Sequence, residues 1–280
     1  MKKAILIVSF GTSHRDAREH SLNCIVRDIR TMAEHVTGAF ANNPGGEDRD
    51  GSPEMVGIYQ AYTSGMVLST LAREGVRIFT VEQAVEQILS DGARELVVVP
   101  THMIPGMEYH KMLNTLEAYR SGFDRLEVTT TVLEKQRDCE TLVPVLQDIF
   151  GFEPGIEYIL MGHGSEADAN IRYAQMNKAF AGAGLSNVRI ASVEAKPDME
   201  DALERLNRIK CYKNIEKVIV QPFMVVAGDH AKNDMAGEED SYVTRLREAG
   251  FAVEAVIKGL GEYPQFRSLY VEKAKRMLCI

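Results

Sequence analysis

The sequence lacks the features that mark membrane-bound, disulfide-stabilised and nucleic-acid-binding proteins. Its apolar runs fall well short of the ~20 residues that cross a bilayer, so no membrane partner is expected. Only four cysteines occur in 280 residues and none forms a CxxC pair, which is typical of reduced thiols in a cytosolic enzyme. Acidic residues outnumber basic ones by 40 to 32, so nonspecific nucleic-acid binding is not expected either.

The N-terminal sequence MKKAILIVSF is basic and then apolar, as in a secretory signal peptide. Its apolar part, Ala4–Val8, is too short for the core of a signal, and no small-residue cleavage site follows. We therefore interpret this stretch as a first strand and expect the protein to be cytoplasmic.

Common nucleotide-binding and hydrolase motifs are also missing. The sequence contains no GxxxxGK[ST] loop, no GxGxxG turn and no HExxH helix. The segment Gly162–Ser165 resembles the GxSxG elbow only loosely, because its serine is misplaced for a nucleophile. We therefore expect no nucleotide cofactor.

What the sequence does contain is a regular alternation of short apolar runs and longer helical patterns. The runs are rich in β-branched residues, bounded by Gly or Pro and not strictly alternating, which indicates strands covered on both faces. The predicted strands are Lys3–Ser9, Met55–Ala61, Glu95–Pro100, Leu126–Val132, Glu157–Met161, Asn187–Val193, Lys217–Gln221 and Ala252–Ile257. The predicted helices are Arg15–His35, Gly65–Glu74, Val81–Ser90, Tyr109–Ser121, Glu140–Ile149, Ala167–Ala181, Met199–Ile209, Asn233–Ala249 and Tyr263–Leu278.

This order predicts an α/β protein with two similar, doubly wound lobes, each with a four-stranded parallel sheet. We expect an N-terminal lobe over residues 1–142 and a C-terminal lobe over residues 143–262. The final helix, within residues 263–280, is expected to pack back on the N-terminal lobe. The polar stretch Asn42–Pro53 is predicted to be a surface loop.

Two pairs of motifs indicate an internal duplication. The stretch VIVQPFMVVAGDHAKNDM, which begins at Val218, aligns without gaps with LVVVPTHMIPGMEYHK, which begins at Leu96. In this alignment His230 falls opposite Glu108. The turns VSFGTS and MGHGSE also correspond, and they place Phe10 opposite His163.

Four ligand-type residues directly follow predicted strands. Ligands of open parallel sheets bind beyond the carboxyl ends of the strands, where we expect His163, Glu108, His230 and Glu194. Two imidazoles with one or two carboxylates suit Co²⁺, Ni²⁺, Fe²⁺ or Zn²⁺. We therefore predict one metal site in a cleft between the lobes, although a lone histidine after a strand is more often an ordinary turn residue.

Small residues at two helix starts favour an anionic ligand. The loops Phe10–Ser13 and Gly162–Ser165 leave backbone N–H groups at the starts of helices, where carboxylates bind well. His102 precedes Glu108 in the same turn and could line the cleft.

At this point the motifs resemble those of a known family. SFGTS, HMIPGMEY, MGHGS, the SVE strand end, VVAGDHAKNDM and GLGEYP are similar to motifs of the anaerobic sirohydrochlorin cobaltochelatases of cobalamin biosynthesis. These enzymes belong to the class II tetrapyrrole chelatases, which include the ferrochelatases. The resemblance spans nearly the whole chain, and the Asn42–Pro53 insert is its clearest departure.

The resemblance implies a two-lobed α/β enzyme that inserts Co²⁺ into sirohydrochlorin without ATP. By motif, His163 and His230 would bind the metal, and Glu108 or Glu194 would complete the site or accept a pyrrole proton. Which glutamate is the ligand stays open, as do the tetrapyrrole's oxidation state and the oligomeric state.

The remaining predicted contacts are with the tetrapyrrole. The predicted binding residues are Phe10, Gly11, Thr12, Ser13, His102, Gly164 and Ser165. Phe10 and Met103 are candidates for apolar contact with the ring, and the loop amides suit its peripheral carboxylates.

Three alternatives stay open from the sequence. A chelatase of the same family could insert Ni²⁺ or Fe²⁺, because affinity order alone does not choose the metal. The same site could serve a tetrapyrrole- or metal-binding carrier without turnover. Finally, a two-lobed small-molecule-binding protein could use both histidines structurally.

Overall fold

The computed structural model describes residues 2–37, 56–165 and 168–278, which form two compact units. The first unit comprises Met1–His102, Glu108–Val132 and Arg267–Ile280, and the second comprises Met103–Met107 and Leu133–Phe266. Helix α6 (Gln136–Phe150) lies in the second unit. The lobe boundary expected between residues 142 and 143 falls within this helix, and that boundary stays a prediction.

The first unit is built on a parallel sheet in the order β2-β1-β3-β4. Its strands are β1 (Lys2–Ser9), β2 (Val56–Tyr62), β3 (Ala93–Pro100) and β4 (Arg125–Val128). The central strand β1 is buried without interruption from Ala4 to Ser9. A continuous apolar run is what a parallel strand needs when helices cover both of its faces.

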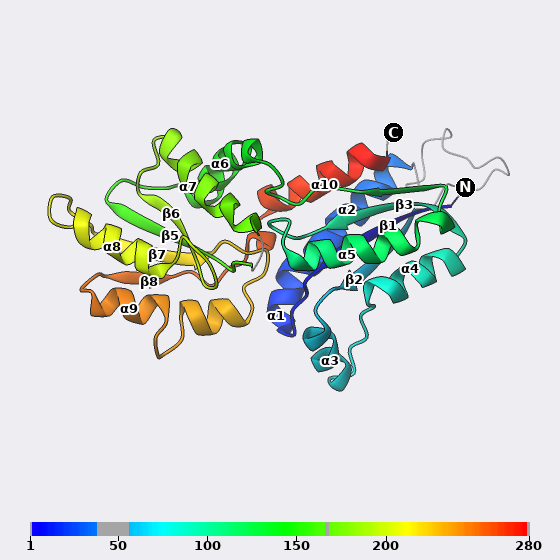
Figure 1. Ribbon diagram of the computed structural model, residues 1–280, viewed down its shortest axis with the longest axis horizontal. Helices are drawn as coiled ribbons and strands as arrows, with labels where there is room; N and C mark the ends of the chain where they lie inside the picture. The colour runs from blue at the N-terminus through cyan, green and yellow to red at the C-terminus, as the bar shows by residue number, and fades with distance from the viewer. Residues whose placement is uncertain (1, 38–55, 166–167, 279–280) are drawn as a thin grey trace. The chain divides into compact units, whose positions relative to one another are not determined.

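Helices cover both faces of this first sheet (Figure 1). Helices α4 (Val81–Ser90) and α5 (Met107–Ala118) pack against the apolar side chains of one face. Helices α2 (Asn23–Val36) and α10 (Pro264–Leu278) lie on the other face. The short helices α1 (Arg15–Ala17) and α3 (Gly65–Arg73) follow β1 and β2, and a π-helical turn, Arg18–Leu22, joins α1 to α2.

Two polar contacts within the first unit hold α10 beside the sheet. The Arg267 guanidinium donates to the Asp28 carboxylate on α2 over 2.5 Å. The Tyr270 hydroxyl donates to the carbonyl oxygen of Thr101 over 3.0 Å, at the end of β3. Both Arg267 and Tyr270 are buried, so the last helix is an integral part of this unit.

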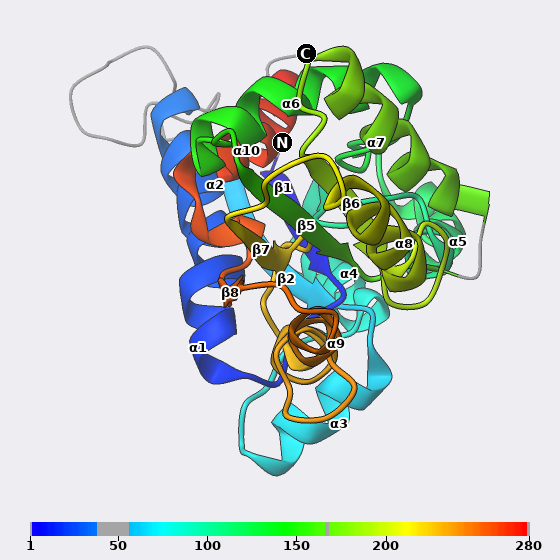
Figure 2. The same cartoon turned by 90° about the vertical axis from the view of Figure 1, so that its left-hand side faces the viewer.

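The second unit repeats the plan with a parallel sheet in the order β6-β5-β7-β8. Its strands are β5 (Ile156–Gly162), β6 (Val188–Ser192), β7 (Lys217–Pro222) and β8 (Val253–Ala255). Helices α6 and α7 (Ile171–Gly182) lie on one side, and α8 (Met199–Ile209) and α9 (Tyr242–Glu248) lie on the other (Figure 2). The predicted α/β class, with two four-stranded parallel sheets, is confirmed.

The two units share backbone details as well as strand order. Gly11 and Gly164, which the sequence alignment pairs, have φ angles of +100° and +98°. The Ser64 N–H donates to the Phe10 carbonyl oxygen just as the Glu194 N–H donates to the His163 carbonyl oxygen. The duplicated motifs therefore correspond to duplicated turns.

Several predicted helix ends are confirmed, and one predicted helix is wrong. Helices α4 and α8 have the predicted bounds, and Thr80 and Gln83 form a capping box at the start of α4. The predicted helix Asn233–Ala249 is interrupted, because a π-helical turn ends at Met235 and α9 begins only at Tyr242. Ser241 starts α9 by accepting a hydrogen bond from the Thr244 N–H, which is a strong local start signal.

The acidic run that precedes Ser241 therefore lies in a loop. Glu238, Glu239 and Asp240 are exposed there, although the helix expected over Asn233–Ala249 would have included them. Two predicted strands are also too long, because β4 ends at Val128 and β8 covers only Val253–Ala255. Both are edge strands with one hydrogen-bonded neighbour, and in each the apolar sequence run is longer than the segment that pairs with that neighbour.

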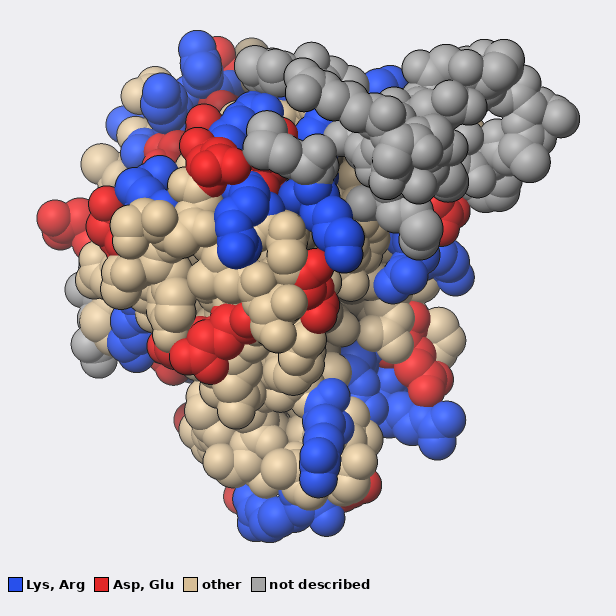
Figure 3. All heavy atoms as spheres, turned by 90° about the vertical axis from the view of Figure 1, so that its right-hand side faces the viewer, with Lys and Arg blue, Asp and Glu red and all other residues tan. Residues whose placement is uncertain are grey.

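Other sequence-based expectations concern a surface loop, membrane-spanning helices, surface charge and the cysteines. The predicted loop Asn42–Pro53 lies outside the described residues. None of the described helices combines the length and apolar character needed to cross a bilayer. On the face shown in Figure 3, basic and acidic side chains are interspersed. The described cysteines, Cys24, Cys139 and Cys211, are free thiols.

Candidate metal centre

Three ligand-type side chains meet beyond the strand ends of the second unit. His163 directly follows β5, Glu194 lies just beyond β6, and His230 opens the π-helical turn Ala231–Met235 after β7. One ligand atom from each lies within 4.8 Å of the other two. The imidazole centroids are 4.3 Å apart and their planes are inclined by 85°. These three residues can therefore reach a common ion.

Parallel strand topology explains the meeting. Strand β5 is the central neighbour of both β6 and β7, so the residues that leave these three strands emerge side by side. The Glu194 N–H donates to the His163 carbonyl oxygen over 2.9 Å, which fixes the two turns together. The carboxylate oxygen of Glu194 lies 3.6 Å from His163 Nδ1.

Hydrogen bonds orient both imidazoles. His163 Nδ1 lies 2.9 Å from the Gly164 carbonyl oxygen, and His230 Nδ1 lies 2.6 Å from a carboxylate oxygen of Asp234. Both partners can only accept, so Nδ1 is the donor in each ring and the lone pair of the neutral ring is on Nε2. Metal-binding histidines in proteins commonly donate their second nitrogen to a carboxylate or carbonyl in this way.

Asp234 is a functional candidate that the sequence reasoning did not identify. It lies four residues after His230, within the π-helical turn, and its carboxylate is half-exposed. The His-x-x-x-Asp spacing places both side chains on one face of a helical turn and could have revealed the pair. A carboxylate in this position makes the imidazole a better electron-pair donor.

The donor set is open to solvent. The side chains of His163 and His230 are 37% and 35% exposed, and that of Glu194 is 51% exposed. Nitrogen and oxygen donors of this kind suit divalent ions of the later first-row metals. Three protein ligands with exposed faces leave coordination positions for a substrate, unlike a closed structural site.

Gly164 holds the Glu194 segment close to His163. Its φ of +98° is unfavourable for any side chain, and a Cβ there would lie 3.1 Å from both the backbone carbon of Glu194 and the backbone nitrogen of Ala195. We expect Gly164→Ala to weaken Co²⁺ binding strongly, because Glu194 must move. Gly184→Ala is the matched control, since Gly184 also has a positive φ, +80°, but has no atom within 4 Å of an added Cβ.

The two glycine variants separate backbone strain from displacement of the site. Each is expected to lose about 1–3 kcal/mol of unfolding free energy from the strained φ. Only Gly164→Ala should lose affinity in a Co²⁺ titration. Equal affinities for the two variants would show that the close approach of Gly164 does not position Glu194.

The predicted site residues of the first unit make local contacts and are not part of the His163, Glu194 and His230 group. Glu108, on α5, accepts a hydrogen bond from Lys111 Nζ over 2.6 Å. Phe10 is 46% exposed, which is unusual for a large apolar side chain, whereas Thr12 is buried and its hydroxyl accepts from the His14 N–H. Gly11 approaches Tyr62, whose ring would lie 2.4 Å from an added Cβ. Ser13 is half-buried.

Two further predicted residues have packing roles in the structure. Ser165 lies next to Gly106 in the second unit, and its carbonyl oxygen accepts from the Asn170 side chain. Met103 is buried, whereas Phe10 is exposed, so of the two apolar candidates Phe10 presents its ring to solvent.

Both ring nitrogens of His102 are buried, and neither has a hydrogen-bond partner among the described residues. It lies edge-on to Tyr109, with ring centroids 6.1 Å apart. Burial lowers the pKa of His102 to about 4, and the negative charge of Glu108 opposes this only in part. The imidazole is therefore neutral at neutral pH.

This histidine should make the stability of the protein depend on pH. Because the pKa of His102 is lower in the folded chain, the unfolded chain binds its proton more readily between pH 6.5 and about 4. Stability is therefore full above pH 6.5 and falls as the pH drops, by about 3 kcal/mol from this residue. We expect His102→Phe to flatten this fall in urea denaturation at pH 7 and pH 5, whereas His35→Phe, on an exposed position, should not. An unchanged slope in His102→Phe would contradict the assignment.

The two parallel-sheet units, with a His-Glu-His group at the strand ends of the second, form a fold with side chains that can hold a metal ion. Residues 50–278 match the family model "Cobalt chelatase (CbiK)". The chain is 31% identical over 274 residues to the sirohydrochlorin cobaltochelatase of Salmonella typhimurium, covering 97% of this chain and 94% of that protein. It is 25% identical to sirohydrochlorin cobaltochelatase CbiKC of Nitratidesulfovibrio vulgaris, covering 97% and 89%.

A solved structure shows the same fold. SirB from Bacillus subtilis with Fe³⁺ aligns with a TM-score of 0.60 at 12% identity, covering 99% of this chain and 95% of that one. The chain therefore belongs to the cobalt chelatase family, and it is a metal chelatase. The family resemblance predicted from the sequence motifs is confirmed.

Proposed function

We propose that this chain inserts Co²⁺ into sirohydrochlorin without a nucleotide and that His163, Glu194 and His230 hold the incoming ion. The observation that carries the proposal is the close approach of these three donors beyond adjacent strand ends. The two relatives with the name sirohydrochlorin cobaltochelatase, both matched over most of their length, support the choice of substrate.

The proposed reaction follows from charge balance. The divalent ion replaces two pyrrole N–H protons of the macrocycle, so two protons must leave as the four ring nitrogens bind the ion. Each bond to a protein ligand must break as the ring nitrogens take over, which favours few and exposed ligands. The exposure of His163 and His230 supports such a transfer.

The proton acceptors are the next part of the proposal. An imidazole that has released the ion carries a lone pair on Nε2, which can accept one pyrrole proton. We assign the other proton to Glu108, the residue that aligns with His230 in the duplicated motif. Its carboxylate accepts a hydrogen bond from Lys111 Nζ over 2.6 Å, on the same helix.

The tetrapyrrole contacts stay as predicted from the sequence. We propose that the exposed ring of Phe10 contacts the macrocycle and that the amides of Gly11, Thr12, Ser13, Gly164 and Ser165 face its carboxylates. His102 is the exception within this group, because buried ring nitrogens support a role in shaping the turn before Glu108. We also propose that the enzyme works in the cytoplasm.

The experiment is an anaerobic assay of purified protein with sirohydrochlorin and Co²⁺, without ATP. Catalysis should change the tetrapyrrole absorption spectrum faster than the uncatalysed reaction, with many turnovers per protein. Parallel reactions with Ni²⁺ and Fe²⁺ determine the preferred metal. Binding of one equivalent of metallated product without turnover would instead establish a carrier and overturn the proposal.

A further inference from the structure

The second unit has a separate polar cavity, which none of the His163, Glu194 and His230 side chains line. Its volume is about 170 Å³, several times the roughly 30 Å³ that a water molecule occupies in the liquid. Three arginines, Arg189, Arg205 and Arg208, line it together with Asn177, Asp198 and Asp201. A cavity with three guanidinium groups is unusual unless an anion or buried carboxylates balance them.

Two elements bring these side chains together. Asp201, Arg205 and Arg208 recur at helical spacing on one face of α8. Arg189 comes from β6, the edge strand of the sheet. The Asn177 side chain on α7 satisfies this strand edge, because it accepts from the Ile190 N–H over 2.7 Å and donates to the Ile190 carbonyl oxygen over 3.1 Å.

Among the residues that the structure describes, Arg205 is the one arginine of the three with a carboxylate partner. Arg205 donates to the buried carboxylate of Glu157 over 2.7 Å and also to the Ser186 carbonyl oxygen. Glu157 accepts a second bond from Lys213 over 2.6 Å, so its single charge already faces two cations. Glu157 therefore compensates the positive charge of the cavity only in part.

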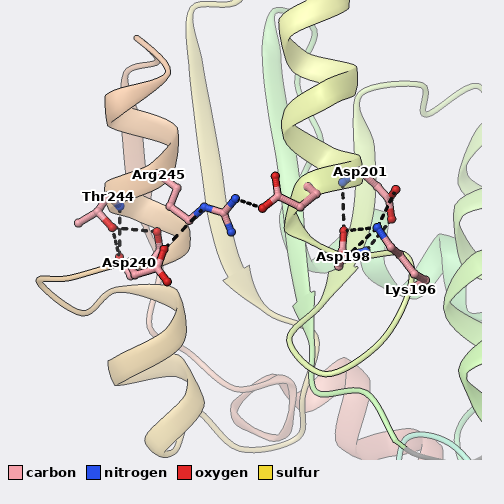
Figure 4. A network of polar contacts seen from close by, with 8 residues as sticks. Lys196, Asp198, Asp201, Asp240, Thr244 and Arg245 are labelled. Carbon is pink, nitrogen blue, oxygen red and sulfur yellow. Dashed lines mark hydrogen bonds and ion pairs between the residues drawn. The ribbon is translucent and has the colours of Figure 1, made fainter.

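The two aspartates at the cavity are also engaged. Asp198 and Asp201 form the capping box at the start of α8, and both are ion-paired with Lys196, at 2.9 and 3.2 Å (Figure 4). Neither contacts Arg189 or Arg208 within hydrogen-bond or ion-pair distance. The positive charges in and beside the cavity therefore outnumber the negative ones by five to three. The cations are Arg189, Arg205 and Arg208 in the lining and Lys196 and Lys213 beside it; the carboxylates are Asp198 and Asp201 in the lining and Glu157 beside it.

Arg189 and Arg208 are left without an ion pair in the described parts of the chain. The Nε of Arg189 is moreover buried and has no hydrogen-bond partner. Burial and then the positive charge of Arg205 lower the pKa of Arg189; the negative charge of Glu157 opposes them, and Arg208 lowers the pKa further. A negative ligand would satisfy the buried donor and relieve this repulsion.

We propose that this cavity binds a compact oxyanion, inorganic phosphate or the phosphate group of a small molecule, between Arg189 and Arg208. A planar guanidinium presents two parallel N–H donors that match two oxygens of a phosphate. The proposal does not depend on the metal-insertion activity, because the cavity and the metal ligands share no side chain.

The test is isothermal titration of the full-length, metal-free protein with sodium phosphate, against sodium chloride at matched ionic strength. Arg208→Gln removes one exposed guanidinium and should weaken phosphate binding by about tenfold or more, since charge-assisted hydrogen bonds are lost. Arg247→Gln is the matched control, because Arg247 is an exposed arginine on α9, away from the cavity lining, and it should bind like the unmodified chain. Arg189→Gln should behave like Arg208→Gln if circular dichroism shows that it folds.

Two further ligands identify the source of the anion. If phenyl phosphate binds as tightly as inorganic phosphate, the natural ligand is a phosphate ester; if it binds more weakly, the natural ligand is the free phosphate ion. Either result supports the site. Acetate binding as tightly as phosphate would overturn the assignment to phosphate. Equal phosphate affinities in Arg208→Gln and Arg247→Gln, or no heat above the chloride control, would overturn the site itself.

Discussion

The double variant His163→Ala/His230→Ala is expected to lose catalysed insertion of Co²⁺ into sirohydrochlorin, with a rate at least about 100-fold below that of the unmodified chain. Both imidazoles are withdrawn from the group whose ligand atoms lie within 4.8 Å, so Glu194 alone remains. One carboxylate provides neither the nitrogen donors that later first-row metals prefer nor a neutral base. Initial rates by absorption spectroscopy measure the effect.

The control for this variant is His35→Ala. His35 is exposed on α2, where its Nδ1 contacts the Thr31 carbonyl oxygen, and its loss should leave the rate unchanged. Because His163 and His230 are both more than one-third exposed, the double variant should keep its circular dichroism spectrum. A folded double variant with an undiminished rate would contradict the proposed function.

Asp234→Ala is expected to weaken Co²⁺ binding by about 10–100-fold, the usual cost of removing the partner of a metal-binding histidine. The Asp234 carboxylate accepts the Nδ1 proton of His230 over 2.6 Å and so keeps Nε2 available as an electron-pair donor. Without it the ring can rotate and can change tautomer. Titration of Co²⁺ followed by its visible absorption bands measures both affinity and ligand geometry.

Two companion variants separate positioning from general loss of charge. Glu239→Ala removes an exposed carboxylate from the loop that follows the same π-helical turn and should leave the affinity unchanged. Asp234→Asn keeps an acceptor oxygen without the charge and should recover part of the affinity. If Asp234→Ala bound Co²⁺ as tightly as Glu239→Ala and gave the same absorption bands, Asp234 would have no positioning role.

The strand ends of the fold could be read from the sequence because their physical determinants are local. Runs such as Ala4–Val8 are apolar without alternation, which requires cover on both faces of a sheet. The residues that leave neighbouring parallel strands emerge at one rim, so His163 and His230 could be placed there without coordinates. The 4.3 Å between their ring centroids follows from that topology.

The details of the turns could not be read in the same way. The sequence pattern over Asn233–Ala249 is compatible with one helix, and only the competition between the π-helical turn and the Ser241 cap ends it. Asp234 comes beside His230 through that turn; their i, i+4 spacing is compatible with contact, but the hydrogen bond between them is known only from the structure. Sequence reasoning also left Glu108 and Glu194 as alternatives, because both follow strands, whereas Glu194 is the one that shares a unit with the two histidines.

The duplicated turns indicate how one unit acquired the donor set. Matching backbone hydrogen bonds pair Ser64 with Glu194 and Phe10 with His163, and the sequence alignment pairs Glu108 with His230. At these matching turns, the first unit has one ligand-type side chain, Glu108, where the second unit has His163, Glu194 and His230. We infer that the second unit provides metal ligation and that the first provides contacts of a different chemistry, such as the exposed ring of Phe10.

The most direct test of the metal centre is anomalous diffraction at the cobalt absorption edge from crystals soaked in Co²⁺. We predict one strong peak bonded to Nε2 of His163, Nε2 of His230 and a carboxylate oxygen of Glu194, at about 2.0–2.2 Å, the distances found for comparable zinc ligands. A peak that excludes either histidine, or that lies away from all three residues, would contradict the account.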